Sequence, residues 1–194
     1  MDATNAAGAT GESRHDLRRW FAEYRPAGSD EERAVAELSE LLEREADPYD
    51  RALPLHLTGS VVVVDPKTRE VLLRWHDRLG AWLQVGGHGD AGERDPLEVA
   101  RREAEEETGL TDLEPWPPGA SIPIHVVVVA VPARNDEAAH RHGDVRYLLA
   151  TKDKAAARPE HDKAPLRWVG IEAAIEEVDG SLRETLRRVR SLLG

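Results

Sequence analysis

The chain has 194 residues, a formal net charge of −11 at pH 7 and no cysteine, which fits one domain with an appendage and excludes disulfides, thiolate metal sites and thiol catalysis. The acidic balance argues against binding to bulk nucleic acid or to anionic membranes, because both depend on Lys and Arg. Since no apolar run approaches about 18 residues, we expect a cytoplasmic protein that does not contact membranes.

The first elements expected are two helices that form an N-terminal arm. Apolar and aromatic side chains recur at helical spacing from Arg14 onwards, and these are Leu17, Trp20, Phe21 and Tyr24. A second helix is expected from about Asp30 to Glu45, where Ser29 and Glu32 have the spacing of a capping box. Such an arm could pack on the main domain, line its cleft or form a homodimer contact.

The composition changes twice along the chain, which divides it into three parts. Residues 1–13 are small and polar, as in a disordered tail. Residues 14–50 hold the helical arm, which ends near an Asp-Pro pair. Residues 51–194 hold the strands and the remaining helices, so we expect them to form the main domain.

All the strands of the main domain are expected before its last two helices. Two apolar runs form a hairpin across an Asp-Pro turn, and further runs lie between turn-forming residues. The expected strands are residues 61–64, 70–75, 81–85, 122–131 and 145–150, with one more around Trp168. A short helix at 171–178 and a terminal helix, capped by Ser181 and Glu184, end the chain.

One central helix is marked at both ends. Asp95 is a suitable N-cap, and Pro96 fits the first helical position, where no amide donor is needed. Gly109 supplies the left-handed residue that ends a helix. The helix follows the glycine loop of residues 86–87, so we expect loop and helix to form one unit.

Three carboxylates lie on one face of this helix. At 100° per residue, Glu103, Glu106 and Glu107 lie at about 0°, 300° and 40°. Like charges at these spacings cost roughly 0.2 to 0.5 kcal/mol per pair, so a hard cation such as Mg²⁺ or Mn²⁺ bound across them would stabilise the face. The alternative is a solvated acidic surface, which is the commoner reason for a run of charges.

The order of glycine loop, acidic loop residue and capped helix resembles the Nudix box, G-x5-E-x7-R-E-U-x-E-E-x-G-U with U apolar. The matching residues are Gly87, Glu93, Arg102, Glu103, Ala104, Glu106, Glu107, Gly109 and Leu110. Eight residues separate Glu93 from Arg102, where the family has seven. Either the loop carries one extra residue, or Glu93 is not the family's loop glutamate.

The resemblance implies an α/β fold of the Nudix type, an α/β/α sandwich with a mixed sheet, to which the helical arm is added. It also implies a metal-dependent pyrophosphohydrolase that uses water to split a nucleoside diphosphate linked to another group. The alternative is a non-catalytic Nudix domain that senses a ligand or binds a partner. The retained box glutamates count against that alternative.

The resemblance further assigns metal ligands. Glu106 and Glu107 would bind Mg²⁺ or Mn²⁺ directly, and Glu103 would be a ligand or a base. In the family, an acidic residue a few positions before a late tryptophan can complete metal binding. Here Glu160 or Asp162 has that place.

Other box residues would shape the site. Arg102 would pair with Glu93 and orient the glutamates, as the resemblance implies. Gly86 and Gly87 would let the loop fold back close to the helix, where a side chain would collide.

Several polar residues outside the helix are candidate substrate contacts. His140, His142 and Asp144 alternate, so they would share one face of a strand, either as a metal or substrate cluster or as a plain polar edge. We favour substrate contacts from His142, Asp144 and Arg146 over a zinc site. His88 follows the glycine loop, where a histidine is more often structural than a ligand, and it remains a candidate contact.

Overall fold

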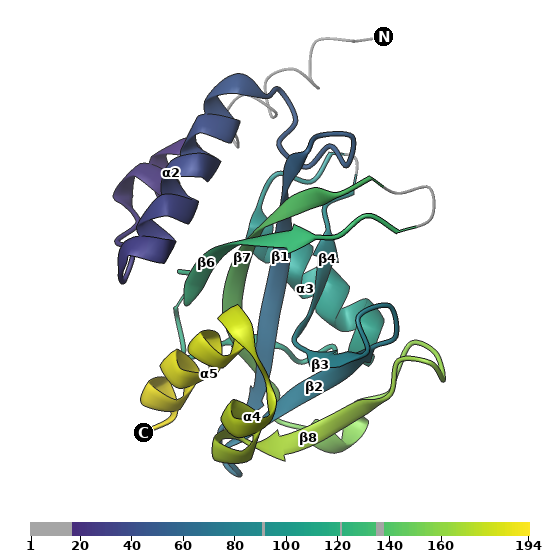
Figure 1. Cartoon of the computed structure of the whole chain (residues 1–194). Helices are drawn as coiled ribbons and strands as arrows, with labels where there is room; N and C mark the ends of the chain where they lie inside the picture. The colour runs from purple at the N-terminus through teal and green to yellow at the C-terminus, as the bar shows by residue number, and fades with distance from the viewer. Residues whose placement is uncertain (1–16, 91, 121, 135–137) are drawn as a thin grey trace, which may run out of the picture.

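Figure 1 shows the computed structural model of the chain, which describes residues 17–90, 92–120, 122–134 and 138–194. A helical segment at residues 17–23 comes first. The elements that follow are, in chain order, α2 (Ser29–Arg44), β1 (Leu55–Asp65), β2 (Glu70–His76), β3 (Ala81–Leu83), β4 (Val85–His88), α3 (Pro96–Thr108), β5 (Glu114–Pro115), β6 (His125–Val131), β7 (His140–Ala150), the 3₁₀ turn η1 (Lys154–Ala156), β8 (Leu166–Gly170), α4 (Ile171–Glu177) and α5 (Gly180–Leu193). The tail expected at residues 1–13 lies outside the described residues.

The strands form one mixed sheet with β1 at its centre. The order of the main path is β3-β2-β1-β7-β5, while β4 pairs with β1, β6 with β7 and β8 with β2. The β1–β7 pairing is parallel, and the other pairings are antiparallel. All eleven residues of β1 are buried, as expected for a strand that is covered on both faces.

Helices cover both faces of this sheet, which confirms the α/β architecture and mixed sheet expected from the sequence (Figure 1). One core cluster joins the sheet to α3 through Val99, Ala100 and Ala104. The second cluster joins the other face to α4 and α5, for example through Ile175 and Leu186. Because α3 carries the three box glutamates beside its core residues, the core also positions the candidate site.

The N-terminal helices pack into the first core cluster. Phe21 and Leu38 are buried there with side chains from β1, β7 and α3. Leu38 occupies the space above Gly143 of β7, since a Cβ atom added at Gly143 would lie 2.2 Å from its Cδ2 atom. The arm therefore lies close against the sheet, although the division of the chain at residues 50 and 51 stays a prediction.

The two capping boxes expected at Ser29 and Ser181 are wrong. Both serines lie inside their helices, and neither helix has a side-chain hydrogen bond at its N-cap. At α2 the Glu31 carboxylate accepts from the Ala27 amide at 2.6 Å, and at α5 the Asp179 carboxylate pairs with Arg183 at 2.9 Å.

None of the helices in the described part of the chain is long and apolar enough to span a bilayer.

Strand β7 is five residues longer at its start than expected. The regular strand was expected only from Val145, because Gly143 and Asp144 favour turns over strands, although the alternation of His140, His142 and Asp144 indicated one shared face. In the structure the stretch from His140 to Asp144 pairs with β1 on one side and β6 on the other, so sheet pairing overrides local preference. The longer strand places His142 directly beside His56 of β1.

Candidate active site

The end of β4 brings the glycine loop against α3. Strand β4 runs antiparallel to β1, with Gly87 opposite Gly59 and His88 opposite Thr58. A Cβ atom added at Gly87 would lie 2.5 Å from the Cδ atom of Glu103. Glycine at this position therefore leaves the room that the Glu103 carboxylate occupies.

The α3 helix has the ends expected from the sequence. The Asp95 side chain accepts a hydrogen bond from the Leu97 amide, Pro96 is the first helical residue, and Gly109 ends the helix with φ of 67°. These ends fix which residues face β4, because each residue turns the helix by about 100°. Glu103 and Glu107 consequently point to the glycine loop, while the Glu106 side chain is more than half exposed.

Glu107 is largely buried and lies beside two donors. The Gly86 amide donates to one carboxylate oxygen at 3.1 Å, and the Arg74 guanidinium lies 3.1 Å from the other. Burial nevertheless raises the pKa of Glu107 to about 7, and the charges of Glu103 and Glu160 add to the rise against the opposing effect of Arg74. Burial also raises the pKa of Glu103.

Arg102 connects the loop to the helix. Its Nε and Nη2 atoms donate to the two carboxylate oxygens of Glu93 at 2.8 and 3.0 Å. Further donors reach Glu103 at 3.1 Å, Glu106 at 3.0 Å and the His88 carbonyl at 2.8 Å. The eight-residue spacing thus still lets Glu93 reach the arginine, and the hydrogen bonds from Arg102 lower the pKa of Glu93.

The carboxylates fit a hard divalent cation. Glu103, Glu106 and Glu107 share one side of α3, and burial disfavours the charge of Glu103 and Glu107. A cation bound across these oxygens would favour the charged forms, and oxygen ligands match Mg²⁺ or Mn²⁺. The donor set therefore suits the metal class expected from the sequence.

Of the two residues expected as an extra ligand, Glu160 shares a partner with this cluster. Its carboxylate is 3.6 Å from the Arg74 guanidinium, which also contacts Glu107. Asp162 is exposed. Neither residue lines the cavity described next, and a metal contact by either stays a prediction.

A cavity of about 760 Å³ opens beside Glu103 and Glu107. This volume lies in the usual range for small-molecule sites, roughly 300 to 1,000 Å³. Its wall carries both acidic and basic groups, and the basic ones include Arg51, Arg74 and Arg78. A second cavity, about 840 Å³, lies between α2, β6 and α5 away from the glutamates, so we assign the candidate site to the first.

Asp144 and Arg146 lie in the wall of the same cavity as a buried pair. The Asp144 carboxylate accepts from Ser60 at 2.6 Å, Thr58 at 3.1 Å and the Arg146 Nε at 2.7 Å. Arg146 also donates to the Thr185 hydroxyl at 2.8 Å. These bonds hold β1, β7 and α5 together below the cavity, and direct substrate contact by the pair stays a prediction.

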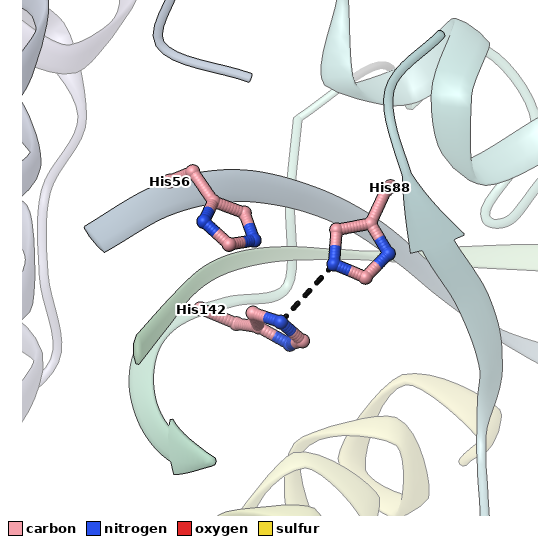
Figure 2. A group of neighbouring side chains, drawn as sticks. All are labelled: His56, His88 and His142. Atoms are coloured by element: carbon pink, nitrogen blue, oxygen red, sulfur yellow. Dashed lines mark hydrogen bonds between the residues drawn. The ribbon is translucent and has the colours of Figure 1, made fainter. Parts of the chain in front are cut away.

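The structure brings His88 and His142 together with a third histidine that the sequence reasoning missed. One ring nitrogen from each of His56, His88 and His142 lies within 4.8 Å of the others (Figure 2). His140, which was expected on the same strand face as His142, contacts His142 at 3.1 Å. His56 was missed because only the parallel pairing of β1 with β7 places it beside His142.

Comparisons with known proteins identify the family and the fold. The NUDIX domain family model matches residues 54–189, whereas a comparison with curated proteins finds no match. The structure is similar to the C. elegans Ap4A hydrolase, with 20% identity, a TM-score of 0.55, and coverage of 71% of this chain and 98% of that one. It is also similar to the E. coli dihydroneopterin triphosphate pyrophosphohydrolase (18% identity, TM-score 0.55, 70% and 94% covered) and to a Clostridium perfringens hydrolase of the NUDIX family (24%, 0.52, 69% and 97%). At these identities the likeness shows the fold alone, and that fold is the one expected from the sequence.

Proposed function

Because the chain belongs to the NUDIX domain family, we propose that it is a metal-dependent hydrolase that splits a phosphoanhydride bond in a nucleoside diphosphate linked to another group. The observation that carries this proposal is the meeting of Glu103 and Glu107 with the glycine loop at the edge of a nucleotide-sized cavity. The products would be a nucleoside monophosphate and a phosphorylated second group, or a related pair.

Mg²⁺ or Mn²⁺ is the proposed cofactor, held by Glu106 and Glu107 with Glu103 as a further ligand or as the base. Such an ion would offset the negative charge of the phosphate oxygens and favour ionisation of water. In the role of base, the Glu103 carboxylate in the cavity wall would accept a proton from the attacking water.

The remaining residues of the site position these groups. Arg102, held by Glu93, keeps the Glu103 carboxylate in place through the 3.1 Å contact. Arg51 and Arg78 in the cavity wall supply positive charge to an anionic substrate. This local charge matters because the chain as a whole carries −11.

Several chemical groups could be linked to the nucleoside diphosphate in the substrate. The family box supports the proposed reaction class, whereas loops outside it would select the substrate. The candidate substrates are nucleoside triphosphates, nucleotide sugars, ADP-ribose and dinucleotide polyphosphates. The similar Ap4A hydrolase supports the last of these, and the similar dihydroneopterin triphosphate pyrophosphohydrolase adds a pterin triphosphate. A homodimer and a cytoplasmic location stay predictions.

The test is a substrate panel with the full chain. Phosphate and nucleotide release would be measured for each candidate with Mg²⁺, with Mn²⁺ and with a chelator. One substrate cleaved far faster than the others, and only with metal, would support the hydrolase and identify the second group. Silence across the panel with Mg²⁺ still bound would favour the ligand-sensing alternative.

A further inference from the structure

Three histidines from three strands converge at the edge of the cavity that Glu103 and Glu107 line. His56 lies on β1, His88 ends β4 and His142 lies on β7, and Figure 2 shows their rings around one space. The Nε2 atoms of His88 and His142 are 3.2 Å apart, and one nitrogen from each of the three rings lies within 4.8 Å of the others. We call this set the histidine cluster.

The protonation of His56 is fixed by its surroundings. Its Nδ1 atom lies 3.1 Å from the Leu53 carbonyl, which can only accept, so Nδ1 carries the hydrogen. In the neutral ring, Nε2 then holds a lone pair. This Nε2 atom is buried and has no hydrogen-bond partner in the described part of the chain. A buried acceptor without a donor is costly, so it points to a ligand.

Two neighbouring rings contact His142. Its Nε2 atom lies 3.2 Å from that of His88 and 3.1 Å from that of His140. The Nδ1 atom of His140 donates to the Ala138 carbonyl at 2.9 Å, so the Nε2 atom is the nitrogen that faces His142. The cluster therefore gathers several ring nitrogens in one place.

The rings of His56 and His88 favour the neutral form. Burial is the main cause that lowers the pKa of His88 to about 3. Burial also lowers the pKa of His56. Neutral imidazole is the form that coordinates an ion, so burial of these two rings is compatible with the geometry of the cluster.

We propose that His56, His88 and His142 bind one divalent transition-metal ion of the Zn²⁺ class, at a site separate from the α3 glutamates. Three ring nitrogens suit Zn²⁺, Co²⁺ or Ni²⁺, whereas Mg²⁺ prefers oxygen. Two nitrogens bound to one zinc ion at about 2.05 Å lie roughly 3.3 Å apart, close to the His88–His142 separation of 3.2 Å. The Leu53 carbonyl orients the His56 ring from behind, as a partner of a metal-binding histidine commonly does.

A metal ion on the histidine cluster would connect the cavity wall to the glycine loop of the Nudix box. His88 follows the glycine loop directly, and its carbonyl accepts from Arg102. An ion on the histidine cluster would fix the end of β4 to β1 and β7. Because His88 and His142 also line the cavity, the ion would have one side open to water or to an oxygen of a bound phosphate.

The test uses Co²⁺ and Zn²⁺ with the full, metal-stripped chain in an excess of Mg²⁺, which occupies the carboxylates. We expect one equivalent of Co²⁺ to bind with the strong visible absorption of a nitrogen-ligated, low-coordinate ion, and Zn²⁺ to displace it. His142→Gln should weaken this binding by at least about 100-fold. His161→Gln, at an exposed histidine outside the cluster, and Glu106→Gln should leave it unchanged.

Circular dichroism of each variant separates loss of the site from loss of the fold. His88→Gln provides a second variant at a half-buried position if the His142 variant does not fold. Absence of Co²⁺ binding by the unsubstituted chain would overturn the proposal, as would equal binding by folded His142→Gln. Loss of the signal in Glu106→Gln would assign the ion to the glutamates instead. None of these readouts depends on hydrolytic activity, so the proposed function stands or falls separately.

Discussion

The Arg188 guanidinium donates to both carboxylate oxygens of Glu31 at 3.0 Å, and this contact joins residues 157 positions apart in the chain. The same carboxylate accepts from the Tyr24 hydroxyl at 2.7 Å and from the Val126 amide at 2.9 Å. The Glu31 side chain is only 2% exposed. One buried group thereby holds α2, β6 and α5 together, and it attaches the arm to the main domain.

Glu31→Gln should destabilise the fold. The substitution leaves Arg188 with a neutral partner in a largely buried place, a loss on the order of 2 to 4 kcal/mol in the free energy of unfolding. Urea unfolding followed by circular dichroism measures it. The control is Glu37→Gln on the same helix, whose ion pair with Arg141 is partly exposed and should be worth less than about 1 kcal/mol. Equal losses in the two variants would contradict the prediction.

The contribution of Glu31 should depend on pH. Burial raises its pKa, but the donors of Ala27, Tyr24 and Val126 and the charge of Arg188 outweigh burial, so the net pKa is lowered from 4.5. A lowered carboxyl pKa stabilises the fold above the unfolded value and loses this effect as the pH falls through the folded value. The stability difference between the original chain and Glu31→Gln should therefore be constant near neutral pH and shrink below about pH 4.5. A difference unchanged down to pH 3, by urea unfolding, would refute this.

Glu107→Gln should reduce the proposed hydrolysis by about 100-fold or more, because it removes a charged ligand of the proposed cation. The thermal midpoint without metal should change little, since burial already disfavours the charge of Glu107. Steady-state rates at saturating Mg²⁺ and a melting curve test both parts. Glu105→Gln is the matched control, because this residue of the same helix does not line the cavity. Normal hydrolysis rates in Glu107→Gln would contradict the proposal that Glu107 binds the metal ion.

Gly87→Ala should impair activity more than stability. The new methyl group would lie 2.5 Å from the Glu103 carboxyl carbon, so the flexible carboxylate must move aside. A displacement of about 1 Å at a catalytic group can cost on the order of 100-fold in rate. Gly170→Ala is the control, because a Cβ atom there meets nothing within 4 Å. Full activity of Gly87→Ala in the same assay would show that Glu103 does not need its present place.

Local signals predicted the centre of the site well. The ends of α3 and the face shared by Glu103, Glu106 and Glu107 follow from neighbouring residues in the sequence, and helix geometry then fixes their arrangement. The pairing of Arg102 with Glu93 of the loop could be expected only through the family resemblance, since eight residues separate the two in the sequence.

Contacts between segments far apart in the sequence could not be predicted from local sequence patterns. The Arg74 contact to Glu107 joins β2 to α3, and nothing near Arg74 in the sequence indicates it. His56 lies in an apolar run whose partner strand could not be chosen from local pattern. No local signal singled out Glu31, because its distant partners come from β6 and α5.

The fit of Leu38 above Gly143 also constrains how this chain could have evolved. Gly143 lies between two residues of the cavity wall, His142 and Asp144, but turns toward the arm. Any side chain at position 143 would need the volume that Leu38 fills. A lineage could therefore enlarge this residue only after residue 38 became smaller or the arm was lost, so glycine at 143 and a large apolar residue at 38 should be inherited together. In relatives without the arm, the glycine should be replaced freely.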